Sequence, residues 1–188
     1  AVHGHFQMLL ESTDGDRLDR ELENELSAIW QQRIDPSEAA GILKKIGYDP
    51  PGEALQVLEG LRGDSETRAL SETGRQRLDR LIPLALMETA RAGQPLPTLH
   101  RVADLIRSIE RRTSYLALLL EYPAALGHLV KLTDASPWVA TFLAQHPVLL
   151  DELLDVHGSA SPTALVWDRH RSPRPSSGCS PTCRPTCS

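Results

Sequence analysis

The sequence predicts an all-α protein, a multi-helix bundle of short amphipathic helices with a disordered C-terminal tail. Through the first 155 residues, apolar side chains recur every three to four positions, as on one face of a helix. No segment alternates apolar and polar residues with β-branched enrichment, as a half-buried strand would. Aromatic residues make up only 4% of the 188 residues, while Leu and Ala abound. A chain of this length can bury one ordinary core or two small ones.

The first predicted elements are two helices joined by a turn. Residues 1–12 have helical apolar spacing and resemble the tail of a longer helix. The polar stretch STDGD at 12–16 predicts a turn between helices. The helix after it has one apolar face made by Leu18, Leu22, Leu26, Ile29 and Trp30.

Proline starts and glycine ends bound the next two helices. Asp35 is the expected N-cap and Pro36 the first-turn residue of one helix, which ends at Gly47. The following helix, YDPPGEALQVLEGLRG, again starts at proline and ends at Gly63. Its predicted core residues are Ala54, Leu55, Val57, Leu58 and Leu61.

Three more helices are predicted up to residue 120. Residues 71–92 form a helix that we expect to break or bend at Pro83. Thr98 is the expected N-cap of the next, which buries Leu99, Val102, Leu105, Ile106 and Ile109. Its opposite, polar side carries Arg101, Asp104, Arg107 and Glu110. The run from Tyr115 to Leu120 is apolar enough to be a buried helix.

A short internal repeat follows at an offset of 24 residues. LLEYPAALGHLVKL aligns with LAQHPVLLDELLDV, which pairs Pro123 with Pro147 and Leu126 with Leu150. Two copies are too few for a solenoid. The repeat therefore predicts two similar helical hairpins packed in one bundle.

Charge and hydropathy exclude several classes of function. Residues 1–155 hold 16 Lys and Arg against 24 Asp and Glu, a balance of −8, which argues against nucleic-acid binding. No stretch approaches 18 uninterrupted apolar residues, so no membrane span is expected. The chain opens without a basic signal-peptide region and without Met, which favours a cytoplasmic protein present as a fragment.

The cysteines and histidines give weak metal-site signals. Cys179, Cys183 and Cys187 recur every four residues in a Ser-, Pro- and Arg-rich tail, with His170 as a conceivable fourth ligand. Structural zinc sites use tighter Cys pairs on a folded knuckle, so disorder is the expected state of this tail. The other histidines share no ligand spacing and are expected at the surface: His3, His5, His100, His128, His146 and His157.

Two further clusters could touch phosphate. Asp14 and Asp16 have the spacing of paired Mg²⁺ ligands, but they lack the strand and Gly-Ser turn of a nucleotidyltransferase, so a turn role is expected. Arg111 and Arg112 beside Glu110 could grip phosphate bidentately, although ion pairs with nearby acids or capping of helix ends explain them more simply. We therefore assign no catalytic, cofactor-binding or metal-binding residue.

A long stretch of the chain resembles a known family. The matching residues are the Arg-Arg-x-Ser-Tyr-Leu-x-Leu-Leu run from Arg111 to Leu119, the Ser-Pro-Trp at 136–138, and HPVLLDELLD at 146–155. They resemble the central helical region of the bifunctional glutamine synthetase adenylyltransferase/adenylyl-removing enzyme of bacteria. Residues 26–63 resemble the preceding family segment more loosely.

This resemblance implies a place in a larger enzyme. The family joins two nucleotidyltransferase domains by helical regions; one domain transfers AMP from ATP to a tyrosine of glutamine synthetase, and the other removes it by phosphorolysis. Both use Mg²⁺ held by a Gly-Ser…Asp-x-Asp constellation, which has no match here. The resemblance thus implies a non-catalytic linker or regulatory region, with glutamine synthetase, a nitrogen-signalling regulator and the adjoining nucleotidyltransferase domains as partners.

The resemblance also implies a division of the chain. Residues 1–63 would follow an N-terminal nucleotidyltransferase domain, 64–155 would form the central helical linker, and 156–188 would be a disordered tail. The family continues with helices after Asp155, so we hypothesise that the tail is a frameshift product. The alternative is a free-standing helical interaction module whose Cys tail binds metal or is redox-active.

Overall fold

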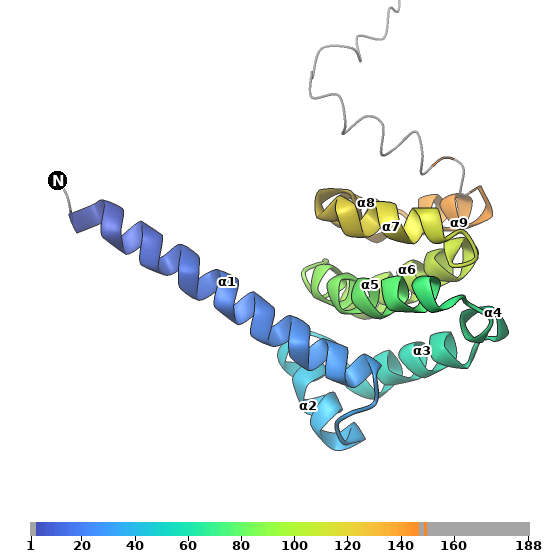
Figure 1. The fold of residues 1–188 in the computed structure, drawn as a ribbon, viewed down its shortest axis with the longest axis horizontal. Coiled ribbons are helices and arrows are strands. Elements are labelled where there is room, and N and C mark those ends of the chain that lie inside the picture. Colours follow the sequence, from blue (N-terminus) through green and yellow to red (C-terminus); the bar gives the residue numbers. More distant parts are fainter. Residues whose placement is uncertain (1–2, 147–148, 150–188) are drawn as a thin grey trace, which may run out of the picture. The chain divides into compact units, whose positions relative to one another are not determined.

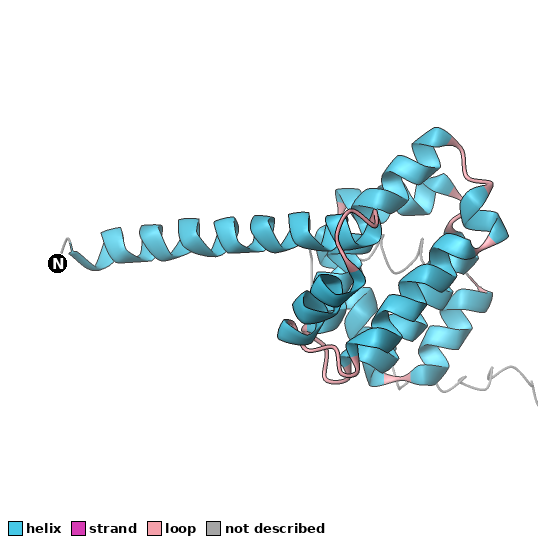
Figure 2. Cartoon of the chain, turned by 90° about the horizontal axis from the view of Figure 1, so that it is seen from below, coloured by secondary structure: helices cyan, strands magenta, loops and turns pink. Residues whose placement is uncertain are grey.

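The computed structural model describes residues 3–146 and 149, and within them it contains helices and connecting loops but no strand (Figures 1 and 2). The all-α prediction is confirmed. The elements are α1 (His3–Trp30), α2 (Pro36–Lys45), α3 (Pro51–Gly63), α4 (Ser65–Arg68), α5 (Glu72–Ala90), α6 (Pro95–Ile109), α7 (Thr113–Glu121), α8 (Pro123–Ala135) and α9 (Pro137–Gln145). The tail at 156–188 and the second half of the repeat lie outside the described residues.

Helices α5 and α6 form the centre of the bundle. α1, α7 and α8 contact α5, while α3, α8 and α9 contact α6 (Figure 1). One hydrophobic core runs from Leu26 to Leu143, so helices on both sides of residue 63 share it. Five residues of the apolar stripe predicted for α6 are all buried, as expected: Leu99, Val102, Leu105, Ile106 and Ile109.

The turn predicted at STDGD is wrong, because α1 is a single helix from His3 to Trp30. Gly15 and its polar neighbours are poor helix formers, each costing about 1 kcal/mol or less, yet none removes a backbone N–H as proline would. The helix therefore continues, with Arg17 and Glu21 paired at 3.0 Å one turn later. Asp14 and Asp16 accordingly lie within a helix and not in a turn.

The predicted apolar face of α1 is only partly buried. Leu26, Ile29 and Trp30 lie in the core, whereas 65% of Leu18 is exposed. The amino-terminal half of α1 runs clear of the other helices (Figures 1 and 2). The apolar spacing thus identified the side of α1 that packs against the bundle. It could not show how far along α1 the covering helix α5 extends.

Three predicted details differ in the structure: the capping by Asp35, the start of α6 and the break at Pro83. Asp35 is the N-cap residue of α2, but its side chain makes no capping hydrogen bond. α6 begins at Pro95 and not after Thr98, which is fully buried in its first turn. α5 is not broken at Pro83 and continues to Ala90, with Pro83 buried inside the helix. Gly47 ends α2 as predicted, with a φ of 111° that glycine adopts readily.

The first copy of the internal repeat lies in the described part of the chain, together with only a few residues of the second copy. α7 spans Thr113–Glu121 and α9 spans Pro137–Gln145, so both ends of α9 lie 24 residues after those of α7. α8 starts at Pro123 and buries Leu126, Leu129 and Val130, the residues that the repeat placed on its apolar face. Their counterparts at Leu150, Leu153 and Leu154 lie outside the described residues.

No single described helix is long and apolar enough to cross a membrane. The pair α7 and α8 reaches the required length and composition only together, and the two helices are bent by 104° at the break between them.

Candidate functional site

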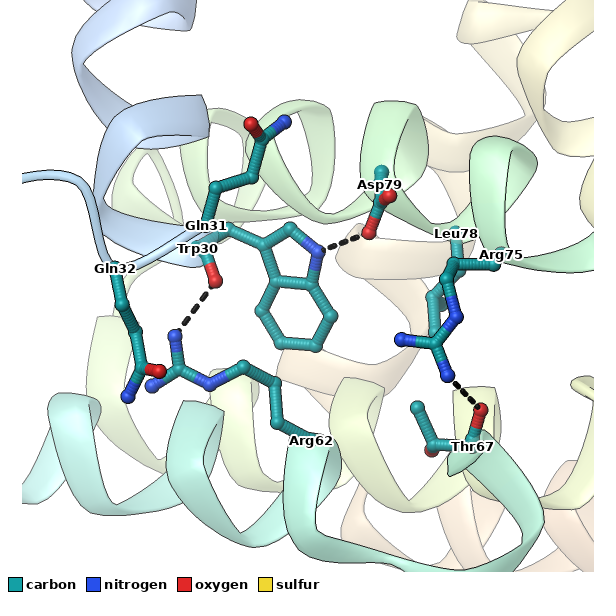
Figure 3. A pocket seen from close by; sticks show the side chains of 8 residues that line it. All are labelled: Trp30, Gln31, Gln32, Arg62, Thr67, Arg75, Leu78 and Asp79. Carbon is teal, nitrogen blue, oxygen red and sulfur yellow. Dashed lines mark hydrogen bonds between the residues drawn. The ribbon is translucent and has the colours of Figure 1, made fainter. Parts of the chain in front are cut away.

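A polar cleft of about 360 Å³ opens where α1, α3, α4 and α5 meet (Figure 3). Trp30 forms its centre: only 3% of the residue is exposed, and its indole Nε1–H donates to Asp79 at 2.7 Å. The Arg62 guanidinium lies 5.4 Å from the centre of the indole ring. This contact is within the range of a cation–π interaction.

Both arginines of the cleft hold helix ends. Arg62 donates to the carbonyl oxygen of Trp30 at 2.6 Å, which places a cation at the negative C-terminal end of α1. Burial lowers the pKa of Arg62, while the nearby Glu59 carboxylate opposes that shift. Arg75 donates to the carbonyl oxygen of Thr67 at 3.2 Å. Spare N–H groups could hold a small anion, but the arrangement is explained fully as a joint between α1 and the bundle.

Arg111 makes an ion pair with a nearby acid, as the favoured interpretation of the Glu110, Arg111 and Arg112 group expected. Arg111 pairs with Glu66 of α4 at 3.1 Å, and the Arg112 guanidinium lies over the Tyr115 ring at 5.9 Å. Glu110 was assigned to the polar side of its helix, which is wrong, because the residue is fully buried. It accepts a hydrogen bond from the Thr67 hydroxyl at 2.6 Å.

Glu110 is an acidic side chain that is fully buried, unlike the other charged side chains in the described part of the chain. Its Oε1 atom is buried and has no hydrogen-bond partner among the described residues. Burial raises the pKa of the carboxyl group above its usual range; Asp64 and Glu66 add to the shift, while the Thr67 hydrogen bond and Arg107 oppose it. Helical spacing placed Glu110 one turn after Arg107, and nothing in the sequence signalled that α4 would cover it.

The other candidates from sequence do not come together. His100, His128 and His146 lie on the surface, as expected. Among the side chains that the structure describes, no three of His, Cys, Asp or Glu cluster as metal ligands. Cys179, Cys183 and Cys187, with His157 and His170, lie outside the described residues, as do the side chains of His3, His5, Asp14 and Asp16.

Tyr48 ties α2 to α5 and was not singled out from sequence as a core residue. Its buried hydroxyl donates to the Leu86 carbonyl oxygen at 2.9 Å and lies 2.6 Å from the Thr89 hydroxyl oxygen. We expect Tyr48→Phe to lower the free energy of unfolding by about 1 kcal/mol, because two buried polar groups lose a partner. Urea denaturation checks this, with the exposed Tyr122→Phe as the matched control, which should leave stability unchanged. Equal effects at the two positions would contradict it.

Asp134 joins the end of α8 to the start of α6. Its carboxylate accepts from the Thr98 hydroxyl at 2.8 Å and from the N–H groups of Gly93 and Gln94 at 3.0 and 3.2 Å. The Thr98 and Gly93 hydrogen bonds hold the pKa of this carboxyl below its usual value. Asp134 therefore ties the loop before α6, and Thr98 in the first turn of α6, to the end of α8.

Asp134→Ala is expected to lower the free energy of unfolding by about 1 kcal/mol at neutral pH, because the hydrogen bonds of its carboxylate are lost. Because the folded pKa is the lower one, this contribution is complete above the unfolded pKa of about 4 and disappears as pH falls through the folded value. Thermal unfolding at pH 7 and near pH 3 measures it. Asp104→Ala, which removes an exposed pair with Arg107, is the control and should show less than about 0.5 kcal/mol. A loss that persists unchanged at low pH would contradict the assignment.

The exposed side of α9 carries an aromatic ladder, which we define as Trp138, Phe142 and His146. The Trp138 and Phe142 rings are stacked, with centroids 5.1 Å apart and planes 13° apart. The Phe142 and His146 ring centroids are 4.6 Å apart. The exposed fraction of Trp138 is 69%, the highest among the large apolar residues that the structure describes as exposed.

Comparison with known proteins gives consistent matches. The chain is 41% identical over 166 residues to the bifunctional glutamine synthetase adenylyltransferase/adenylyl-removing enzyme of Thioalkalivibrio sulfidiphilus, covering 86% of the chain but 17% of the relative. It is 43% identical over 155 residues to the enzyme of that name from Nitrosococcus oceani, and 39% over 156 residues to that from Pseudomonas putida. The chain thus spans about a sixth of the length of these relatives. No family model matches it.

Proposed function

The chain matches one segment of the bifunctional glutamine synthetase adenylyltransferase/adenylyl-removing enzyme, and from this premise we propose that it is a helical linker between the catalytic parts of such an enzyme. One observation carries the proposal: more than four fifths of the chain matches about a sixth of each relative. The match supports a segment of a larger enzyme. It gives no support to a free-standing interaction module with a metal-binding Cys tail.

The architecture of the described residues suits a spacer. A single core joins the helices from α1 to α9, and buried polar contacts such as Trp30–Asp79 and Thr67–Glu110 lock neighbouring helices together. Such a body can hold flanking domains at a fixed separation, because packed interiors deform little. The linker would also be the place where effector binding at one part is relayed to another.

The chemistry of the whole enzyme would take place outside this segment. We infer that it transfers AMP from ATP to glutamine synthetase and removes it again, with Mg²⁺ and ATP bound by the adjoining nucleotidyltransferase domains. A nitrogen-signalling regulator protein would be a further partner, and the cytoplasm the site of action. For the chain itself the proposal is positioning and not catalysis.

A segment-replacement experiment tests the proposal. The matched segment of the Thioalkalivibrio sulfidiphilus enzyme is replaced by the corresponding residues of this chain, and AMP transfer to glutamine synthetase and its removal are measured. We expect both activities in the chimera and neither in the isolated 188-residue chain. A Gly/Ser linker of equal length is the matched control and should uncouple or abolish the activities. AMP transfer by the isolated chain, or a folded but inactive chimera, would overturn the proposal.

A further inference from the structure

The aromatic ladder exposes large aromatic rings on a side of α9 that faces solvent. α9 contains no charged residue, although 24% of the whole chain is charged. A stacked Trp–Phe pair in contact with solvent loses the stabilisation that burial of large aromatic side chains provides. Exposed aromatic side chains on an uncharged face are characteristic of protein contact surfaces.

The ladder lies on the side of α9 that does not pack against the bundle. Ala140 and Leu143 are the buried residues of α9, and α6 is the helix that it contacts most. Trp138, Phe142 and His146 follow one another at intervals of four residues along the exposed side. Within the described part of the chain, this side of Trp138 has no covering helix.

We propose that the aromatic ladder is the docking surface for an apolar helix from the part of the same enzyme that lies outside this segment, which rests on the proposed function. The matched relatives are about six times as long as the matched segment, so most of each enzyme lies beyond it. The uncharged, apolar sequence of α9 favours an apolar partner surface, because aromatic side chains gain most from contact with other apolar groups and an unpaired acid buried against them would be costly.

The size of the ladder favours a partner in the same polypeptide over a second copy. A stable contact between free molecules buries about 800 Å² on each side and involves 20–30 residues. Two side chains on a nine-residue helix and one at its C-cap are too few for that. A tethered partner has a high effective concentration, so a small aromatic contact suffices to hold it.

Hydroxyl-radical footprinting read by mass spectrometry tests the docking directly, because oxidation of Trp138 reports the exposure of its side chain. In the isolated chain Trp138 should be oxidised much faster than Trp30, which is buried in the core. In the active chimera described above, we expect oxidation of Trp138 and Phe142 to fall severalfold while that of Trp30 stays low.

The outcomes separate this inference from the proposed function. An active chimera in which Trp138 is oxidised as fast as in the isolated chain would overturn the docking surface and leave the linker proposal standing. A folded chimera without AMP transfer would instead overturn the linker proposal. Concentration-dependent dimerisation of the isolated chain that Trp138→Glu abolishes would show a second copy as the occupant, and so would overturn the docking partner proposed here.

Paired substitutions supply a functional readout. Trp138→Glu should leave the thermal unfolding of the isolated chain unchanged, because the side chain is largely exposed. In the chimera it should restore fast oxidation of Phe142 and alter the coupling between AMP transfer and removal. Leu18→Glu is the matched control: Leu18 is an equally exposed apolar residue on α1. If both substitutions had the same effect in the chimera, the ladder would have no special role.

Discussion

Trp30→Ala is expected to lower the free energy of unfolding by about 3–5 kcal/mol, the usual cost of removing a buried tryptophan. The indole fills the joint between α1 and the bundle, donates to Asp79 at 2.7 Å and stacks against Arg62. Its loss leaves a cavity and a partly buried carboxylate without its partner. The cost is a large share of the stability of a typical domain, so the variant would be only marginally folded.

Trp138→Ala is the matched control for this measurement. It removes the same side chain from a position that is 69% exposed, so we expect a change within about 0.5 kcal/mol. Guanidinium denaturation followed by far-ultraviolet circular dichroism measures both variants without depending on tryptophan fluorescence. Similar losses of stability at the two positions would contradict the burial assigned to Trp30.

Glu110→Gln is expected to raise the free energy of unfolding at pH 7 by about 1 kcal/mol, the energy of a tenfold change in proton affinity, because the folded chain is spared a buried charge. At this pH the unfolded chain holds Glu110 ionised, whereas the folded chain must either bury the charge or take up a proton. Glutamine is uncharged, so the folded chain neither buries a charge nor takes up a proton at this position. Its carbonyl oxygen can still accept from the Thr67 hydroxyl.

The stability gained by Glu110→Gln should depend on pH, and the raised pKa of Glu110 sets the direction of that dependence. Since the folded pKa of Glu110 is the higher one, the folded state binds more protons, and wild-type stability falls as pH rises above the unfolded pKa of about 4.3. The advantage of Glu110→Gln should therefore grow from pH 4 to pH 7 and vanish below pH 4. Glu121→Gln, at an exposed position, is the control and should show no such divergence. A constant difference across this pH range would contradict the interpretation.

The buried acid has a structural explanation in the order of the helices. Glu110 follows α6 directly, and its carboxylate meets Thr67 in the short helix α4, 43 residues earlier in the chain. The contact holds the α3–α4 corner onto the end of α6. A carboxyl group is a costly way to make that contact, and the expected gain from glutamine measures the cost.

Local sequence determined much of the architecture. Prolines at the start of α2, α3 and α8, and glycines at the end of α2 and α3, placed these helices. Proline fixes φ and lacks an N–H, which suits a first turn, whereas glycine adopts the conformations that end a helix. Apolar spacing predicted the core faces of α3, α5 and α6. The motifs between Arg111 and Asp155 predicted the family of the relatives that the chain matches.

Tertiary structure decided the features that depend on distant residues. Whether Leu18 or Leu26 is covered depends on where α5 ends, and whether Glu110 meets water depends on α4. Asp134 reaches the loop before α6 only because α8 returns beside it. Likewise, Trp30 and Trp138 both lie in helices, but the first is buried and the second is exposed. Periodicity records which side of a helix is apolar, whereas burial requires a partner surface, and the position of that partner is set by the packing of the whole chain.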